Sequence, residues 1–186
     1  MSSHRGSALG GLLALSGPGS FTGLRIGLST AFGLHQALGI RAAAVPTLEV
    51  LAIEASDSKG ASSVVAAVDA LRGEWSVQKF ARGADGTLRA QGDIEIVAAD
   101  DLARFAPATL TGFGVGKLAS LPPELDLHEP GPLAPATLRW AALREPAWNA
   151  LALCRPLYAR PPAATLPSPR PRTPAPGLTV TLSDPK

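Results

Sequence analysis

Residues 9–47 decide the fold, and they read LGGLLALSGPGSFTGLRIGLSTAFGLHQALGIRAAAVPT. The apolar run at 9–15 stops at Ser16-Gly-Pro-Gly19, as a buried strand does where it enters a tight turn. The hydroxyl of Ser20 can accept a hydrogen bond from an early amide of a following helix. Apolar residues then recur at helical spacing until Gly39, which is a typical helix end. These features predict a strand followed by a helix of about 18 residues.

The next residues repeat this order of elements. Residues 40–45 predict a second buried strand, and Pro46 and Thr47 predict the start of a further helix with its apolar face at 48–55. The polar, glycine-containing stretch at 56–63 is typical of a linker between lobes. Strand, helix, strand, helix is the pattern of an α/β fold.

Beyond residue 63 the chain is rich in residues that favour β-structure. We expect strands at 64–68, 75–80 and 94–97, with turns at 69–73 and 83–86, the latter typical of a hairpin. We also expect a helix behind an aspartate cap at 99–105, a strand ending at 110–112 and a last helix at 133–143. The sequence therefore predicts a second lobe that is built on a small mixed sheet.

Composition and charge exclude several classes of protein. Of 186 residues, 46% are apolar and 17% are charged, which rules out a disordered or collagen-like chain. The sequence has no run of about 18 apolar residues, the length needed to span a bilayer. We expect a cytoplasmic protein. The formal charge of +2 comes mostly from arginines after residue 154, which argues against a body that grips nucleic-acid backbones. The proline-rich residues 161–186 predict a flexible tail.

Two glycine clusters suggest phosphate binding at first sight. Gly17 to Ser20 precede a helix, where glycine amides and the helix start favour an anion. The spacing matches neither a Walker A nor a dinucleotide-binding motif, so a plain turn is preferred and an anion site stays open. The second cluster, at 112–117, lacks the glycine and the hydroxyl residue that a P-loop requires at 111 and 118. We reject a P-loop there.

The first helix carries glycines in its interior, where each costs about 1 kcal/mol relative to alanine. Gly23, Gly27 and Ala31 are spaced four residues apart and predict a smooth stripe where another element can approach closely. Leu24, Leu28 and Phe32 flank this stripe. Packing on the chain's own sheet and contact with a helix of another subunit explain the stripe equally well.

Residues suited to catalysis are scarce. The three histidines His4, His35 and His128 are scattered, and the single cysteine, Cys154, has no partner at metal-ligand spacing. We therefore expect no catalytic, cofactor-binding or metal-binding residues in this chain. An enzyme, either a nucleotide hydrolase or an M22-type peptidase that uses the turn at 17–20, is kept as a second hypothesis.

Four segments of the chain resemble one family. Ser16-Gly-Pro-Gly-Ser-Phe-Thr-Gly-Leu-Arg-Ile-Gly27 is similar to a central motif of the TsaB family, also called the YeaZ type, within the Gcp-like/M22 glycopeptidase superfamily. Residues 45–51 resemble its next helix start, residues 68–74 its second-lobe hairpin and residues 155–161 its closing P-x-Y-x-R segment. Ordered motifs over most of the chain make this resemblance specific.

The resemblance implies a two-lobed α/β fold of the actin/Hsp70-like type and a role in making N6-threonylcarbamoyladenosine beside the anticodon of tRNAs. Family members act there as non-catalytic scaffolds that pair with a catalytic TsaD subunit, and a TsaE ATPase joins the assembly. ATP and metal are then expected on the partner subunits, tRNA is contacted only through the complex, and a homodimer is possible. The implied partner interface is Phe21, Gly23, Leu24, Arg25, Gly27, Leu28, Ala31 and Phe32.

A comparison with TsaD itself supports the non-catalytic assignment. TsaD is a relative whose metal site uses a histidine pair in a segment that resembles residues 45–51. Thr47 and Leu51 occupy the corresponding positions here. Neither side chain replaces imidazole as a metal ligand, so the resemblance implies the non-catalytic paralogue.

The resemblance also implies a division of the chain. We expect a remnant of the first lobe with the interface helix at 1–57, a second lobe with a return helix at 58–160 and the tail at 161–186. Family members ordinarily begin with about 55 further residues, whose strands cover the edge of the first sheet. The first lobe is therefore expected to be incomplete at its N-terminus, and a truncated, nonfunctional copy is the third hypothesis.

Overall fold

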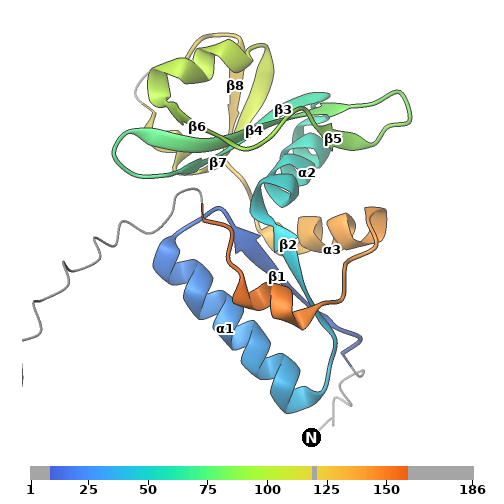
Figure 1. Cartoon of the computed structure of the whole chain (residues 1–186). Helices are drawn as coiled ribbons and strands as arrows, with labels where there is room; N and C mark the ends of the chain where they lie inside the picture. Colours follow the sequence, from blue (N-terminus) through green and yellow to red (C-terminus); the bar gives the residue numbers. More distant parts are fainter. Residues whose placement is uncertain (1–8, 119–120, 159–186) are drawn as a thin grey trace, which may run out of the picture.

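The computed structural model describes residues 9–118 and 121–158. Strand β1 (Leu12–Gly17), helix α1 (Phe21–Leu38) and strand β2 (Ala42–Pro46) follow one another as the sequence predicts, and the two strands pair in parallel (Figure 1). The Ser20 hydroxyl accepts from the Gly23 amide at 3.3 Å, and α1 ends at Gly39 with a left-handed φ of 64°. The predicted caps of this helix are confirmed.

Helix α2 (Thr47–Lys59) is longer than expected. The linker predicted at 56–63 is wrong, because Ser56 is buried within α2 and its hydroxyl donates to Ala61 O at 2.6 Å. The helix ends at Gly60 in a left-handed conformation, and the next strand begins only three residues later. The expected boundary between residues 57 and 58 thus falls inside a helix.

A six-stranded mixed sheet forms the second lobe. Its strands are β3 (Ser63–Asp69), β4 (Glu74–Arg82), β5 (Leu88–Ala90), β6 (Glu95–Ala98), β7 (Ala108–Phe113) and β8 (Leu125–His128). β3 lies at the centre, antiparallel to β4 and parallel to β7, while β8 extends the β7 side and β5 and β6 pair with successive parts of β4. The strands predicted at 64–68, 75–80 and 94–97 and the hairpin turn at 83–86 are confirmed.

The shorter elements differ more from expectation. The segment at 99–105 is the 3₁₀ helix η1 (Ala99–Phe105), and no side chain caps it, so the predicted aspartate cap is wrong. Asp100 and Asp101 lie in its first turn instead. Strands β5 and β8 and the 3₁₀ helices η2 (Val115–Lys117) and η3 (Ala150–Cys154) have no counterpart in the sequence-based expectation, whereas helix α3 (Leu133–Leu143) does.

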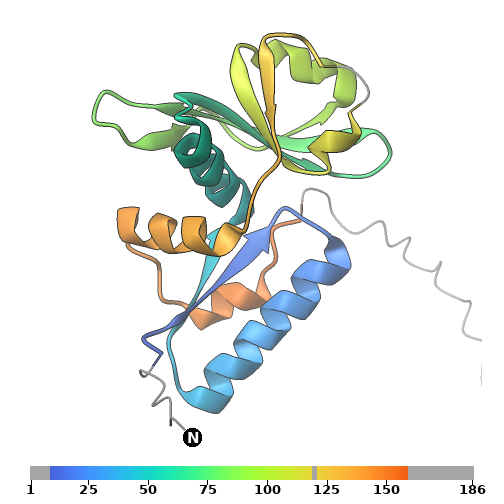
Figure 2. The ribbon, with the colours of Figure 1, turned by 180° about the vertical axis from the view of Figure 1, so that it is seen from behind.

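Three clusters of buried side chains hold these elements together. One cluster lies between α2, α3 and the six-stranded sheet and includes Val45 of β2, so it joins the two sheets. A second covers the opposite face of the large sheet beneath η1, and a third lies between β1, β2, α1 and η3. We call β1, β2, α1 and η3 the small unit and the six-stranded sheet with η1 and η2 the large unit. Figure 2 shows α2 and α3 between the two units.

Two further points complete the description. The tail predicted at 161–186 lies outside the described residues. No helix in the described part of the chain is both long and apolar enough to cross a membrane.

Candidate functional site

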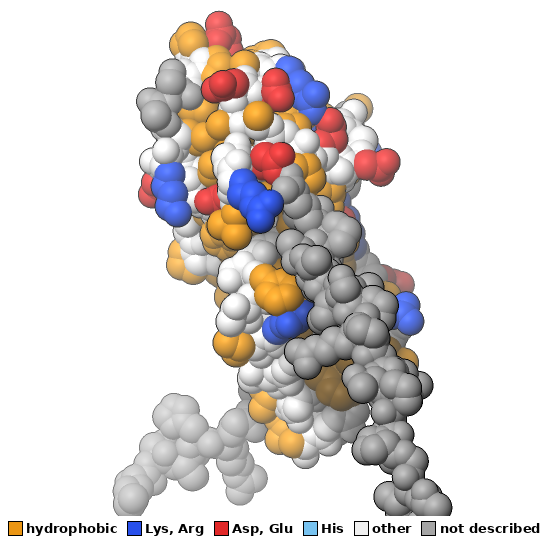
Figure 3. All heavy atoms as spheres, turned by 60° about the vertical axis from the view of Figure 1, so that its left-hand side comes forward, with side chains coloured by type: hydrophobic (Ala, Val, Ile, Leu, Met, Phe, Trp, Pro, Cys, Tyr) orange, Lys and Arg blue, Asp and Glu red, His pale blue; other side chains and the backbone are white. Residues whose placement is uncertain are grey.

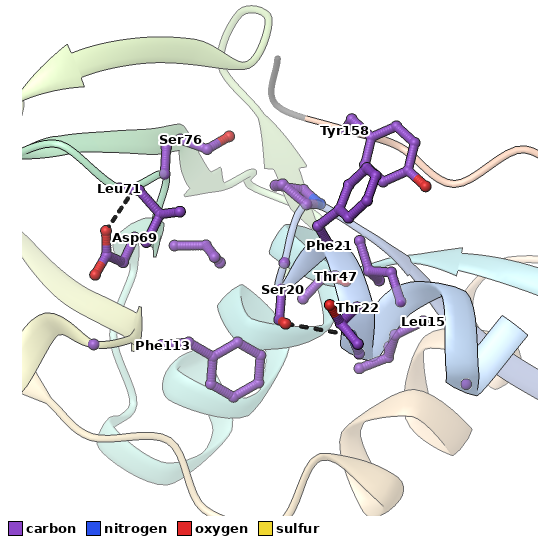
Figure 4. Close-up of a pocket in the computed structure, with 18 of the residues that line it drawn as sticks. Leu15, Ser20, Phe21, Thr22, Thr47, Asp69, Leu71, Ser76, Phe113 and Tyr158 are labelled. Carbon is purple, nitrogen blue, oxygen red and sulfur yellow. Dashed lines mark hydrogen bonds between the residues drawn. The ribbon is translucent and has the colours of Figure 1, made fainter. Parts of the chain in front are cut away.

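A cleft of about 860 Å³ opens between the first turn of α1 and the large unit (Figure 4). The small unit contributes Leu15, Ser20, Phe21 and Thr22, and the large unit contributes the β3–β4 turn and the end of β7. Asp69 and Lys117 are the charged residues among its walls, which are otherwise apolar or hydroxyl-bearing. The cleft is therefore a largely apolar groove with few polar anchoring groups.

The turn between β1 and α1 forms one wall of the cleft. Its backbone is held from below, because the Gly17 amide donates to Thr47 Oγ1 at 3.1 Å and Ser16 Oγ donates to Val45 O at 3.1 Å. Leu157 N donates to Ser16 O at 2.7 Å, and a Cβ at position 17 would lie 2.2 Å from Leu157 O. Glycine is thus required at position 17, where φ is +114° and another backbone passes close by. The plain-turn interpretation accounts for this glycine without an anion.

The opposite wall is the turn between β3 and β4. Leu71 and Arg72 both have left-handed φ angles, 67° and 59°, and the Leu71 amide is held by Asp69 Oδ1 at 2.7 Å. Leu71 is 71% exposed, and Phe113 at the end of β7, which also lines the cleft, is 44% exposed. Ser76 on β4 also lines the cleft; it is fully buried, and its Oγ has no hydrogen-bond partner among the described residues.

The structure separates the candidate interface residues on α1 into two groups. Leu28 and Ala31 are 2% and 5% exposed and pack against Leu153 and Ala42, so they belong to the core of the small unit. The other residues are at least partly open to solvent, namely Phe21, Gly23, Leu24, Arg25, Gly27 and Phe32. A spacing of four residues advances about 40° around a helix at each step, so the predicted stripe turns from the surface into the core at Ala31.

The helix glycines do not pack on the chain itself. Apart from the adjacent backbone of α1 itself, a Cβ at Gly27 or Gly33 would have no atom within 4 Å, and one at Gly23 would meet only the Ser20 side chain at 3.4 Å. Contact with the chain's own sheet therefore does not explain these glycines within the described residues. Of the two explanations that the sequence left open, contact with another molecule fits this geometry better.

The exposed side of α1 is also unusually uncharged. In its 18 residues Arg25 is the only Lys, Arg, Asp or Glu. Ile26, Leu34 and Leu38 are 63%, 42% and 56% exposed, in addition to Phe21 at 43%. Figure 3 shows charged side chains gathered over the large unit and mainly hydrophobic or uncharged ones over the small unit. A solvated helix ordinarily carries charges on its outer face, so this face has the composition of a contact surface.

Tyr158 joins this surface from the far end of the described chain. Its ring lies 5.0 Å from the Phe21 ring, centroid to centroid, and Arg25 Nε donates to its hydroxyl at 2.9 Å. The sequence places Tyr158 in a family motif but predicts no role for it. Arg25 and Tyr158 are 133 residues apart in the chain, and the sequence alone gives no sign that they are in contact.

Thr47 and Leu51, which the family resemblance relates to a histidine pair of TsaD, have structural roles here. Thr47 Oγ1 accepts the Gly17 amide, and Leu51 is fully buried in the core. His128 is paired with Glu54 at 2.8 Å, and His35 Nδ1 lies 2.6 Å from Ile40 O. Within residues 9–118 and 121–158, no three His, Cys, Asp or Glu side chains gather as a metal site.

Comparison with known proteins identifies the family. The model of the family described as TsaD, tRNA N6-adenosine threonylcarbamoyltransferase, matches residues 9–120, which is more than half of the chain. The chain belongs to this family. It is 41% identical over 70 residues to the tRNA threonylcarbamoyladenosine biosynthesis protein TsaB of Escherichia coli (strain K12). That match covers 38% of this chain and spans only 30% of the length of the relative.

Solved structures of YeaZ proteins share the fold. YeaZ from Pseudomonas aeruginosa superposes with a TM-score of 0.61 at 26% identity, covering 81% of this chain and 74% of that one. A second Pseudomonas aeruginosa structure, described as similar to peptidase YEAZ, gives 0.61 at 27% identity over 82% of this chain and 74% of that one. The predicted α/β fold of the actin/Hsp70-like type and the TsaB/YeaZ resemblance are confirmed.

Proposed function

We propose that this chain is a non-catalytic subunit of the assembly that makes N6-threonylcarbamoyladenosine in tRNA, and that it docks on the catalytic TsaD subunit through the outer face of α1. By this name we mean the candidate residues that are open to solvent, namely Phe21, Gly23, Leu24, Arg25, Gly27 and Phe32. The name of the Escherichia coli relative and the family match support the pathway. The uncharged, glycine-bearing outer face of α1 supports the docking surface. That face is the single observation that carries the proposal.

The chemistry of the surface fits a helix of a second protein. Gly27 has open space beside it and Gly23 has only the Ser20 side chain, so another backbone can approach closely here, and the exposed Phe21 supplies an aromatic anchor. Arg25 adds a guanidinium that an acidic group on the partner can pair with. Because Leu28 and Ala31 are buried, they support this face from within the small unit and do not contact the partner.

The non-catalytic role rests on the residues at the expected metal positions. Thr47 and Leu51 are engaged in a backbone hydrogen bond and in core packing, and neither is an imidazole. In this proposal ATP and metal are bound by the partner subunits, TsaE-like and TsaD-like, and tRNA is reached only through the complex. The proposed location is the cytoplasm, where tRNA is modified, and a homodimer through the same helix is the competing assembly.

A second candidate function is favoured by the cleft. Its volume of about 860 Å³ and the start of an 18-residue helix at its wall are suited to a nucleotide, whose phosphates prefer a helix N-terminus. The first-turn amide of Gly23 is already capped by Ser20, and the Gly17 amide is held by Thr47, which weakens this candidate. Calorimetric titration with ATP tests it, and the absence of saturable binding and of turnover would remove it.

The docking proposal is tested by enlarging one glycine. Gly27→Leu adds a side chain that points into open space, so the fold is retained and the helix gains about 0.5–1 kcal/mol of propensity. Gly33→Leu is the matched control, because Gly33 is equally open and lies outside the candidate residues. We expect Gly27→Leu to weaken binding to purified TsaD by at least about ten-fold in calorimetry, and Gly33→Leu to leave it unchanged. Equal binding of Gly27→Leu and the wild type would show that α1 docks elsewhere or not at all.

A further inference from the structure

Three side chains from the two ends of the described chain form a compact cluster on α1. The Arg25 guanidinium carbon lies 3.8 Å above the centroid of the Phe21 ring and 5.9 Å from that of the Tyr158 ring. The two rings are 5.0 Å apart and inclined by 34°, and Figure 4 shows them side by side at the edge of the cleft. Arg25 Nε also donates to the Tyr158 hydroxyl at 2.9 Å. We call these three residues the aromatic clasp.

The backbone that carries Tyr158 is anchored independently of its ring. Leu157 N donates to Ser16 O at 2.7 Å, and the absence of a side chain at Gly17 lets the two backbones meet. The ring of Tyr158 is therefore presented to α1 from a fixed point. Deleting the ring should loosen Phe21 and Arg25 without releasing the chain that carries it.

We propose that Tyr158 is a positioning residue for the docking face of α1, and that the surface offered to the partner subunit is composite, made by α1 together with the ring of Tyr158. This inference rests on the proposed function. Phe21 is the exposed aromatic side chain of the outer face and Arg25 is its charged group, and the clasp holds both. The half-buried Tyr158 ring then forms the margin of the same surface.

The physical reason is pre-organisation. An arginine side chain loses rotamer freedom when it is fixed in an interface, and this loss opposes binding. In the clasp the guanidinium is already held by a ring below and by a phenol hydroxyl beside it, so most of that loss occurs on folding. A partner that docks on α1 therefore meets Phe21 and Arg25 in one arrangement. Removing Tyr158 takes away the hydrogen bond to Arg25 and the ring beside Phe21, so it restores part of their freedom and weakens docking while both side chains remain in place.

The first experiment tests the clasp without a partner. Tyr158 is the only tyrosine of the chain, so 3-fluorotyrosine introduced in expression gives one fluorine resonance that reports on this ring alone. We expect its chemical shift to differ from that of the unfolded chain and to move in Phe21→Leu and in Arg25→Ala. A resonance at the unfolded position that neither variant moves would overturn the proposal.

The second experiment measures docking on purified TsaD by calorimetry. Tyr158→Ala is expected to weaken binding about ten-fold, and Tyr158→Phe, which keeps the ring and loses one hydrogen bond, about three-fold. Leu157→Ala is the neighbouring control, because that side chain is 41% exposed and lies outside the clasp, and it should bind as the wild type does. The fluorine resonance should also shift on addition of TsaD, which a residue that only tethers the chain would not show.

The outcomes separate this inference from the proposal beneath it. If the wild-type chain does not bind TsaD, both the docking proposal and the positioning role of Tyr158 are wrong. If the wild type binds and Tyr158→Ala binds equally tightly, the positioning role is wrong and the docking proposal stands. Partial recovery in Tyr158→Phe together with the shift on TsaD addition supports the composite surface.

Discussion

The central strand of the large unit and the first strand of the small unit are both apolar, yet they are buried to very different degrees. In β3 the residues Val64, Val65, Ala66 and Ala67 are all 0% exposed, because β4 and β7 pair on either side and a cluster covers each face. In β1 the residues from Leu12 to Leu15 are all only half-buried. Within the described residues β1 pairs with β2 alone.

This difference shows where each unit obtains its stability. The large unit satisfies the backbone groups of its central strands and buries their side chains within one sheet. Within the described residues no further strand pairs with either edge of the small unit's sheet, and one face of α1 is open; such surfaces are where other chains attach. A protein with this distribution is stabilised mainly by one unit and is expected to interact through the other.

The largest expected effect compares the stability of the two units by replacing leucine with alanine once in each of them. Leu110→Ala in β7 removes a fully buried side chain and should lower the free energy of unfolding by about 2–5 kcal/mol. Leu12→Ala in β1 removes a half-buried side chain and should cost about 1 kcal/mol. Urea unfolding monitored by circular dichroism measures both. Equal costs would show that the small unit is packed as tightly as the large one.

A second prediction tests whether α2 is held to the large unit through Glu54 and His128 of β8. Glu54 accepts hydrogen bonds from Ser58 Oγ and Gly131 N and pairs with His128 at 2.8 Å, and both ionisable side chains are less than 15% exposed. Glu54→Ala leaves the buried His128 without this partner and should cost about 2 kcal/mol. Asp57 lies on the same helix as Glu54, and Asp57→Ala breaks its exposed pair with Arg139 of α3, which should cost less than about 1 kcal/mol. If the two variants unfold at the same urea concentration, α2 is not fastened through β8.

A smaller effect is expected at the turn that faces the small unit across the cleft. Leu71 has a left-handed φ of 67°, which strains a residue with a side chain, so Leu71→Gly should raise stability by about 0.5 kcal/mol. Leu138→Gly, at a similarly exposed helical site, should instead lower it by about 1 kcal/mol. Thermal unfolding distinguishes the opposite signs. A loss in both variants would mean that the turn tolerates leucine without strain.

The smallest effect concerns the surface of the large unit at the β4–β5 turn. Hydrogen bonds from the Arg89 side chain and the Thr87 amide lower the pKa of Asp85 to about 2 from 3.8. Because the folded state favours the ionised form, this interaction stabilises the fold above pH 4 and is lost as the pH falls toward 2. Carboxyl NMR titration should show the low midpoint, and Arg89→Ala should return it toward the ordinary value. An unchanged midpoint in Arg89→Ala would exclude the arginine as the cause.

Local signals predicted part of the structure well. The Ser20 cap, the αL glycine at Gly39 and the turn at 83–86 depend on neighbouring residues, and all three are present. Strands β5 and β8 were not predicted, because three or four residues become a strand only when a partner strand lies beside them. The polar end of α2 reads as a linker in the sequence, because nothing local to Ser56 indicates that it is buried with its hydroxyl bonded to Ala61 O.

The candidate site divides in the same way. The uncharged glycine-bearing helix and the family motif were visible in the residues themselves, and so was the absence of a histidine pair at Thr47 and Leu51. Which face of α1 is outermost was not visible, so Leu28 and Ala31 were placed in the interface although they are buried.

By itself, the sequence determined the order of the main elements, the caps of the first helix and the family. It also identified α1 as a nearly uncharged, glycine-bearing helix that is a candidate contact surface. Only the tertiary structure decided which side of α1 is free and that Tyr158 meets Phe21 and Arg25. The physical reason is the distance along the chain over which each kind of interaction acts. Periodicity and capping act over a few residues of one chain segment, whereas burial and the clasp depend on where η3 and the chain beyond it fold back against β1 and α1.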